Sequence, residues 1–150
     1  MSIAWELLSK VRKLKQEEKF VSELTEKNPS VSVALIYPSP YNIAMSSLGY
    51  QTIYRLFNLM DDVICERSFL PEDTDLYRKK KSKLFTFESE TEVDKFDVLA
   101  FSVAYETEIL GLIENLELNV HRISLQFTDG SWGICTCRAS RTSAIRRIVQ

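Results

Sequence analysis

The chain has 150 residues, of which 45% are hydrophobic and 27% are charged, and its formal net charge at pH 7 is −2. This length suits one ordinary domain and this composition is close to the globular average, which excludes a chain dominated by loops or dependent on a disulfide framework. No apolar run approaches the roughly 18 residues of a membrane helix, and the N-terminus lacks the apolar core of a signal peptide. We therefore expect a cytoplasmic protein with reduced cysteines and no membrane contact.

Charge is distributed unevenly along the chain. The segment from Val120 to Gln150 contains five arginines and one acid, Asp129, and so carries a charge of +4. Removing these from the totals of 19 basic and 21 acidic residues leaves 14 and 20, so positions 1–119 carry −6. The composition therefore changes near residue 119.

The first half of the chain predicts a helix, a buried strand and a second helix. Residues 4–25 form an amphipathic pattern that lapses at Glu18, where we expect a bend or an early end. Val31–Tyr37, with the sequence VSVALIY, is typical of a strand buried on both faces of a parallel sheet. A helix follows, with Ser46 or Ser47 as its N-cap. Its apolar stripe consists of Ile53, Leu56, Phe57 and Met60.

The second half continues the alternation of strands and helices. The charged connection 71–83 suits one helical turn, and Glu106–Leu118 predicts a helix. The apolar stripe of that helix consists of Ile109, Leu112, Ile113 and Leu116. Strands are predicted over residues 63–70, 84–89, 96–104 and 121–130.

This order of elements indicates an α/β protein, with a Rossmann-like or flavodoxin-like parallel sheet flanked by helices. We expect Val31–Tyr37 and Val98–Val103 to be adjacent central strands, because such continuous apolar runs need cover on both faces. The residues expected to be almost fully buried are Ile36, Ile53, Phe57, Leu99 and Phe101.

Ligands of parallel sheets gather beyond the carboxyl ends of the strands, which directs attention to residues 38–47 and 102–107. We expect these loops to converge on one cleft with a polar rim, and an anion or polar ligand to lie at the helix N-terminus there. A second interpretation stays open, in which the serines only cap the helix and the helix dipole stabilises Glu106. The candidate ligand-binding residues are Ser39, Tyr41, Asn42, Ser46, Ser47, Gly49, Ser102, Tyr105 and Glu106.

Other motifs are weaker. Cys135 and Cys137 form a C-x-C pair, but a zinc site needs further ligands, so we expect no metal site and no catalytic residue. Neither phosphate-binding glycine signature occurs. The basic run at 78–83 is flanked by acids and is typical of a solvated loop. The arginines of the tail lack an RNA-binding aromatic motif, which argues against a nucleic-acid partner.

Four blocks of sequence together resemble a known family. They are YPSPYNIAMSSLGYQTIYRLFN, ICERSFLP, LFTFES and FDVLAFSVAYE, and they lie within residues 31–110. The chain resembles the N-terminal, cobalamin-binding-like domain of a group of radical S-adenosylmethionine proteins. The resemblance implies a module that presents a corrinoid or shapes a substrate site, with a radical S-adenosylmethionine domain as its partner in cis or in trans.

The sequence departs from the family pattern at several positions. Ser39 replaces an Asp, and Ala44 and Ala100 replace glycines. The D-x-H-x-x-G motif is absent, so cobalamin would bind without a histidine ligand from it. The C-x-x-x-C-x-x-C motif is absent too, so no iron–sulfur cluster is expected in this chain.

The resemblance ends near Glu117. We therefore expect an N-terminal helix over 1–28, the α/β domain over 29–119, and a tail over 120–150. The tail fits either a divergent stand-alone protein or a frameshifted or truncated reading of a longer gene, and the abrupt change favours the second. The leading prediction is a ligand- or partner-binding module that is not catalytic alone. The alternative is a cofactor-free interaction or regulatory domain that has kept the fold.

Overall fold

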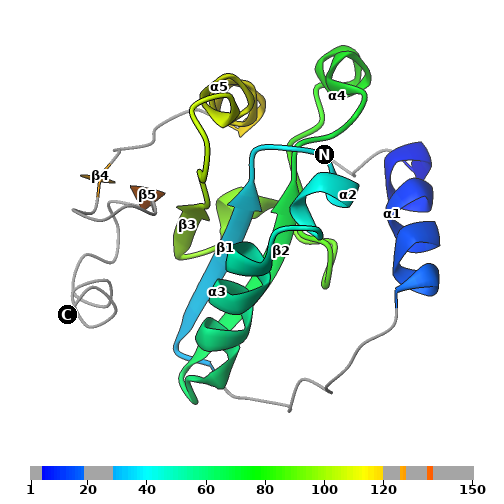
Figure 1. The fold of residues 1–150 in the computed structure, drawn as a ribbon. Coiled ribbons are helices and arrows are strands. Elements are labelled where there is room, and N and C mark those ends of the chain that lie inside the picture. Colours follow the sequence, from blue (N-terminus) through cyan, green and yellow to red (C-terminus); the bar gives the residue numbers. More distant parts are fainter. Residues whose placement is uncertain (1–4, 19–28, 120–125, 128–134, 137–150) are drawn as a thin grey trace.

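A computed structural model describes residues 5–18, 29–119, 126–127 and 135–136 of the chain (Figure 1). The helices are α1 (Trp5–Glu17), α2 (Tyr41–Ala44), α3 (Leu48–Leu59), α4 (Thr74–Lys80), the 3₁₀ turn η1 (Val93–Lys95) and α5 (Glu108–Asn119). The strands are β1 (Val31–Tyr37), β2 (Val63–Phe69), β3 (Val98–Phe101), β4 (Gln126–Phe127) and β5 (Cys135–Thr136).

The centre of the fold is a three-stranded parallel sheet in the order β2-β1-β3. Val33 of β1 pairs with Cys65 on one side and with Val98 on the other. This arrangement confirms the predicted α/β class and the predicted adjacency of the first and the late strand. Within the described residues β1 is seen with a neighbour on each side, and whether β3 is also central stays a prediction. All four residues of β3 are buried.

Helices cover both faces of the sheet, as the continuous apolar strands predict. Val33 and Leu35 of β1 pack with α2 and α3 on one face. Ala34 and Ile36 point to the other face and pack in a cluster with side chains of α1, α4 and α5. Successive side chains of β1 point to opposite faces of the sheet, so this one strand contributes to the apolar core on both faces.

One predicted strand, over residues 84–89, differs in the structure. Residues 84–89 form no strand, and the segment makes one isolated bridge, between Phe85 and Glu92. It turns back on itself through Glu90, whose φ is +58°, and the Thr86 amide donates to the carbonyl of Thr91. Its alternating pattern therefore reflects burial of Phe85 and Phe87 in a turn, not a place in the sheet.

The end of the predicted first helix and most of the predicted last strand lie outside the described residues. The described part of the helix ends at Glu17, next to the lapse predicted at Glu18. Gln126–Phe127 pairs antiparallel with Cys135–Thr136, separately from the parallel sheet. The division into a helix, a domain and a tail stays a prediction.

The helices are rotated relative to their predicted apolar stripes. In α3 the fully buried residue is Tyr50, whereas Leu56 and Met60 are exposed. Ile53 and Phe57 are only half-buried, so the prediction of almost complete burial is wrong for these two. It is confirmed for Ile36, Leu99 and Phe101.

The same rotation is seen in α5, where Leu112 and Leu116 pack on the core and Ile109 and Ile113 are exposed. Each helix covers the sheet from one side only. Half of each predicted stripe therefore faces outward.

We expect Phe101→Ala to lower the free energy of unfolding by about 3–5 kcal/mol, because the Phe101 side chain is completely buried between the sheet and its helices. Urea unfolding followed by circular dichroism measures the change. Leu56→Ala, at an exposed position of α3, is the control and should change stability by less than about 0.5 kcal/mol. A loss below about 1 kcal/mol for Phe101→Ala would contradict this packing.

Candidate functional site

Side chains from both predicted loops influence the pKa of Tyr37, at the carboxyl end of β1. Burial raises the pKa of Tyr37 to about 12, and a hydrogen-bonding interaction with the Glu108 carboxylate adds to this rise. The Ser47 hydroxyl lowers this pKa, and the charge of Tyr105 raises it further. Ser47 belongs to the first loop and Tyr105 to the second, so residues of both loops act electrostatically on one hydroxyl group.

Several polar groups at this edge also cap the helices. The Ser47 hydroxyl accepts a hydrogen bond from the Tyr50 amide at 3.4 Å, as one of the two open interpretations predicts. Ser46 donates to the carbonyl of Ile43 at 2.6 Å. The Glu108 carboxylate accepts from the amides of Ala104, at 2.6 Å, and Tyr105, at 3.1 Å.

Glu108 was not among the predicted residues. An acid in the first turn of a predicted helix is the signal that points to such a cap. The predicted Glu106 is instead exposed, and its carbonyl accepts from the Ile109 amide.

Four other candidates do not join this group through any contact that the structure describes. The carbonyl of Ser39 accepts from the Leu70 amide, and the Ser102 amide continues the pairing of β3 with β1 by donating to Ile36. Gly49 lies half-buried in the first turn of α3, and Asn42 is exposed on α2.

Gly111 brings α5 into direct contact with the end of β1. A Cβ at Gly111 would lie 2.1 Å from the carbonyl oxygen of Pro38, far inside van der Waals contact. The α5 backbone therefore lies against the residue that follows β1, and the helix covers the edge between the two predicted loops. A pattern of apolar residues does not reveal such a contact, because it depends on the missing side chain.

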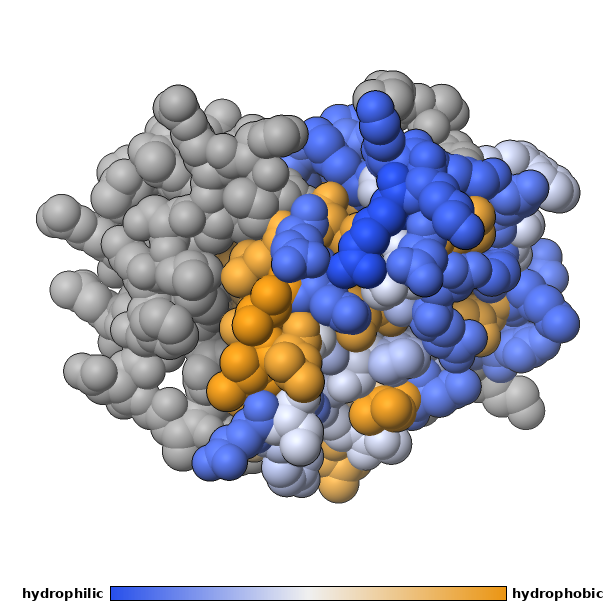
Figure 2. Space-filling model, turned by 90° about the horizontal axis from the view of Figure 1, so that it is seen from above, coloured by the Kyte–Doolittle hydropathy of each residue, from blue (hydrophilic) through white to orange (hydrophobic). Residues whose placement is uncertain are grey.

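The outer face of α5 carries an apolar patch. Its members are Tyr105, Ile109, Leu110 and Ile113, which are 47–73% exposed. Figure 2, which looks onto the carboxyl end of the sheet, shows apolar side chains gathered over this helix. Contiguous apolar surface of this kind marks an interaction site more often than scattered exposed residues do.

A buried arginine joins the far edge of the sheet to α1. The Arg67 side chain, in β2, is 3% exposed and forms ion pairs of 2.6 Å with Glu18, which directly follows α1, and with Glu88. Its guanidinium carbon lies 5.0 Å from the ring centroids of Tyr54 and Phe87. Two carboxylates and two aromatic faces therefore compensate the burial of this cation.

The carboxylates around Arg67 hold several segments together. Glu88 also accepts from the Arg67 amide at 2.6 Å, and Tyr41 donates its hydroxyl to Glu18 at 3.2 Å. Burial raises the pKa of Glu88, and the positive charge of Arg67 opposes that rise.

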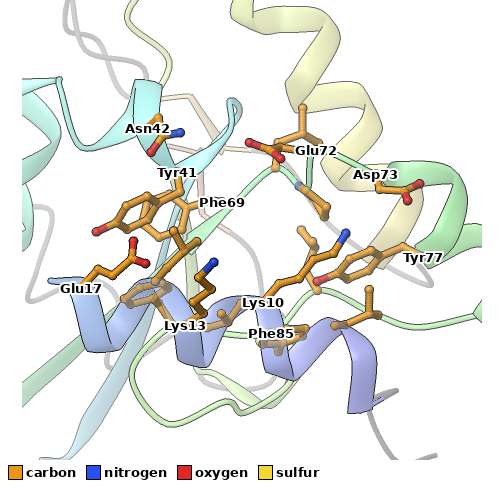
Figure 3. Close-up of a pocket in the computed structure, with 17 residues that line it drawn as sticks. Lys10, Lys13, Glu17, Tyr41, Asn42, Phe69, Glu72, Asp73, Tyr77 and Phe85 are labelled. Carbon is orange, nitrogen blue, oxygen red and sulfur yellow. The ribbon is translucent and has the colours of Figure 1, made fainter.

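A cavity of about 360 Å³ lies between α1 and the carboxyl end of β2 (Figure 3). Two predicted residues, Tyr41 and Asn42, line it. The remaining walls come from α1, from the start of α4 and from residues 84–87. Sequence reasoning missed these walls because they meet only when α1 folds onto the sheet.

Among the described residues we find neither a cluster of metal ligands nor a membrane-spanning helix. Within the ranges that the structure describes, no three His, Cys, Asp or Glu residues are grouped to hold a metal ion. Of the C-x-C pair, Cys135 lies in β5 and Cys137 is outside the described residues. None of the helices described has both the length and the apolar character needed to cross a bilayer.

Comparison with known proteins yields one match. A family model described as "Radical SAM proteins, N-terminal" matches residues 49–129, just over half of the chain. The matched segment begins at the start of α3 and includes β2, β3 and α5. No curated protein matches the chain, and no solved structure does.

We expect Arg67→Met to lower the free energy of unfolding by about 3–5 kcal/mol, because it leaves two carboxylates without their buried cation. Arg12→Met is the matched control, since the Arg12–Glu90 pair is largely exposed on the arginine side and should contribute little to stability. Chemical denaturation of both variants measures the difference. Equal losses would show that the cluster around Arg67 does not hold α1 as described.

We expect Gly111→Ala to destabilise the domain by at least about 1–3 kcal/mol, since the new methyl group must push α5 away from the carbonyl of Pro38. Higher helix propensity alone would predict a gain of about 1 kcal/mol, so the sign of the change distinguishes the two effects. Thermal unfolding provides the measurement. Leu110→Ala, at the exposed neighbouring position, controls for general disturbance of the helix and should have little effect.

Proposed function

The chain belongs to the radical S-adenosylmethionine protein family, of which it carries the N-terminal domain, and from this premise we propose that it is a docking module for a radical S-adenosylmethionine catalytic domain. The module binds that domain, in cis or in trans, through the outer face of α5. It performs no chemistry alone. A buried free thiol, Cys65, is consistent with the reducing cytoplasm that we propose as its location.

The apolar patch on α5 is the observation that carries this proposal. Ile109 and Ile113 are four residues apart and so share one face of α5, with Leu110 beside them and Tyr105 in the turn that precedes the helix. The patch adjoins the carboxyl end of β1, the side of a parallel sheet where functional sites gather. Of the sequence-predicted residues, we assign the exposed Tyr105 and Glu106 to the docking surface.

In the proposed complex, the residues of this chain would hold the docking surface in place and exclude water from it. None of them would take part in the reaction. Glu108 fixes the start of α5 by accepting two backbone amides, and Gly111 sets the height of the helix above the sheet. Together they present the patch as a rigid surface. When docked, the catalytic domain would supply the radical chemistry, and this domain would form one wall of its site.

The described residues do not fit a cobalamin between the predicted loops. The α5 helix already lies on Pro38 there, and the motif for a histidine ligand to cobalt is absent. The cavity of about 360 Å³ is near the lower limit for drug-sized ligands, which is too small to enclose a corrinoid. We therefore favour the cofactor-free form of the module and assign no step to a corrinoid.

Docking is tested by isothermal titration of the full chain with a purified catalytic domain from a family member that carries both domains. Leu110→Asp and Ile113→Asp should each weaken binding about tenfold or more, because each places a charge in the apolar interface. Leu59→Asp is the matched control, at an equally exposed leucine on α3, and should bind like the parent chain. Undiminished binding by both α5 variants would overturn the proposed surface.

The same protein preparation tests whether the chain binds cobalamin. We expect hydroxocobalamin to show no change in its visible absorption on titration with the chain, because the edge of the sheet is covered by α5. A saturable spectral change would contradict the cofactor-free form and favour corrinoid binding.

A further inference from the structure

The cavity beside α1 has aromatic walls at both ends. Tyr41 packs edge-to-face against Phe69, with ring centroids 5.3 Å apart. Tyr77 stacks on Phe85, with centroids 6.2 Å apart and planes inclined by 15°. Figure 3 shows the first pair at one end of the cavity and the second pair at the other. The space between them suits a flat, apolar group.

The hydroxyl group of Tyr77 lacks a protein partner within the described residues. The residue is only 7% exposed, and in Figure 3 its hydroxyl points into the cavity. Burial raises the pKa of Tyr77, so the group is a neutral hydrogen-bond donor. A polar atom of a ligand in the cavity would accept a hydrogen bond from this group.

Two lysines of α1 bring positive charge to the same space. Figure 3 shows Lys10 and Lys13 extending from the helix into the cavity, and neither forms an ion pair with any residue that the structure describes. Glu6, the acid one turn before Lys10, is paired with Lys80.

Three acids also line the cavity, and they are as exposed to solvent as the two lysines. Asp73 turns toward α4, where its carboxylate accepts from the Leu76 amide at 3.0 Å. Lys10, in contrast, extends toward the hydroxyl end of Tyr77 (Figure 3). A cation next to a hydroxyl donor at this end of the cavity favours a ligand with an anionic group there.

We propose that this cavity is a binding site for a small aromatic monocarboxylate. The ring of the ligand lies between the two aromatic pairs, and its carboxylate accepts hydrogen bonds from the Tyr77 hydroxyl and the Lys10 ammonium group. The volume of about 360 Å³ is in the lower part of the range of small-molecule pockets, which limits the ligand to one ring or two fused rings. This site is separate from the docking surface on α5 and does not depend on it.

Titration of the full chain with 3-phenylpropanoate, followed by nuclear magnetic resonance and calorimetry, tests the site. We expect saturable binding that is about tenfold tighter than that of 3-phenylpropan-1-ol, which has the same ring and no charge. The cation 3-phenylpropylamine should bind more weakly still, because it meets the two lysines. Equal or tighter binding of the alcohol or the amine would overturn the assignment of an anionic ligand.

Two variants test the residues. Tyr77→Phe keeps the ring that stacks on Phe85 and removes only the hydroxyl, and Lys10→Met removes a charge from a solvent-exposed position. Each should weaken 3-phenylpropanoate binding about tenfold, while Lys79→Met, an exposed lysine of α4 outside the cavity, should leave it unchanged. Absence of saturable binding by the parent chain, or unchanged affinity in both variants, would overturn the proposal. Lys10→Met keeps the test valid if Tyr77→Phe lowers stability.

Discussion

The burial of one cation, Arg67, organises the edge of this domain. A guanidinium group at the centre of a sheet edge is tolerated only when its charge is matched, and Glu18 and Glu88 supply that match from two segments far apart in the chain. The ion pairs therefore hold the end of α1 and the turn after Phe87 in place. The α1 helix is held by both polar and apolar contacts, since Lys15 donates to the carbonyl of Glu88 and Leu7 is buried in the core.

A second constraint acts at the opposite edge of the sheet. Because Gly111 has no side chain, α5 lies directly on the carbonyl of Pro38, with Leu112 and Leu116 on the core and Ile109, Leu110 and Ile113 facing outward. The contact closes the place where parallel sheets commonly bind ligands, and it also creates an exposed apolar surface beside that place. The chain carries the N-terminal domain of a radical S-adenosylmethionine protein, and our proposal assigns this surface to the catalytic domain of such a protein.

The candidate sites could be predicted in part. Ser47 and Tyr105 both act on the pKa of Tyr37, and loops that follow parallel strands emerge on the same side of a sheet, a rule that needs only the order of the elements. Tyr77 and Lys10 could not be predicted in this way. They share a cavity only because α1 folds back across the sheet, and no local pattern encodes that path.

The sequence by itself determined the class of the fold and the identity of its strands. The run Val31–Tyr37 is apolar enough to require burial, and the alternation of helices with strands favours parallel pairing. Only the tertiary structure decided which face of each helix is buried, because an apolar stripe is wider than the contact that one side of a sheet offers. For the same reason Leu56 and Ile113 are apolar yet exposed. Arg67 pairs with two distant carboxylates, and α5 covers Pro38. Both contacts join segments that come together only when the chain is folded, so the tertiary structure determines them as well.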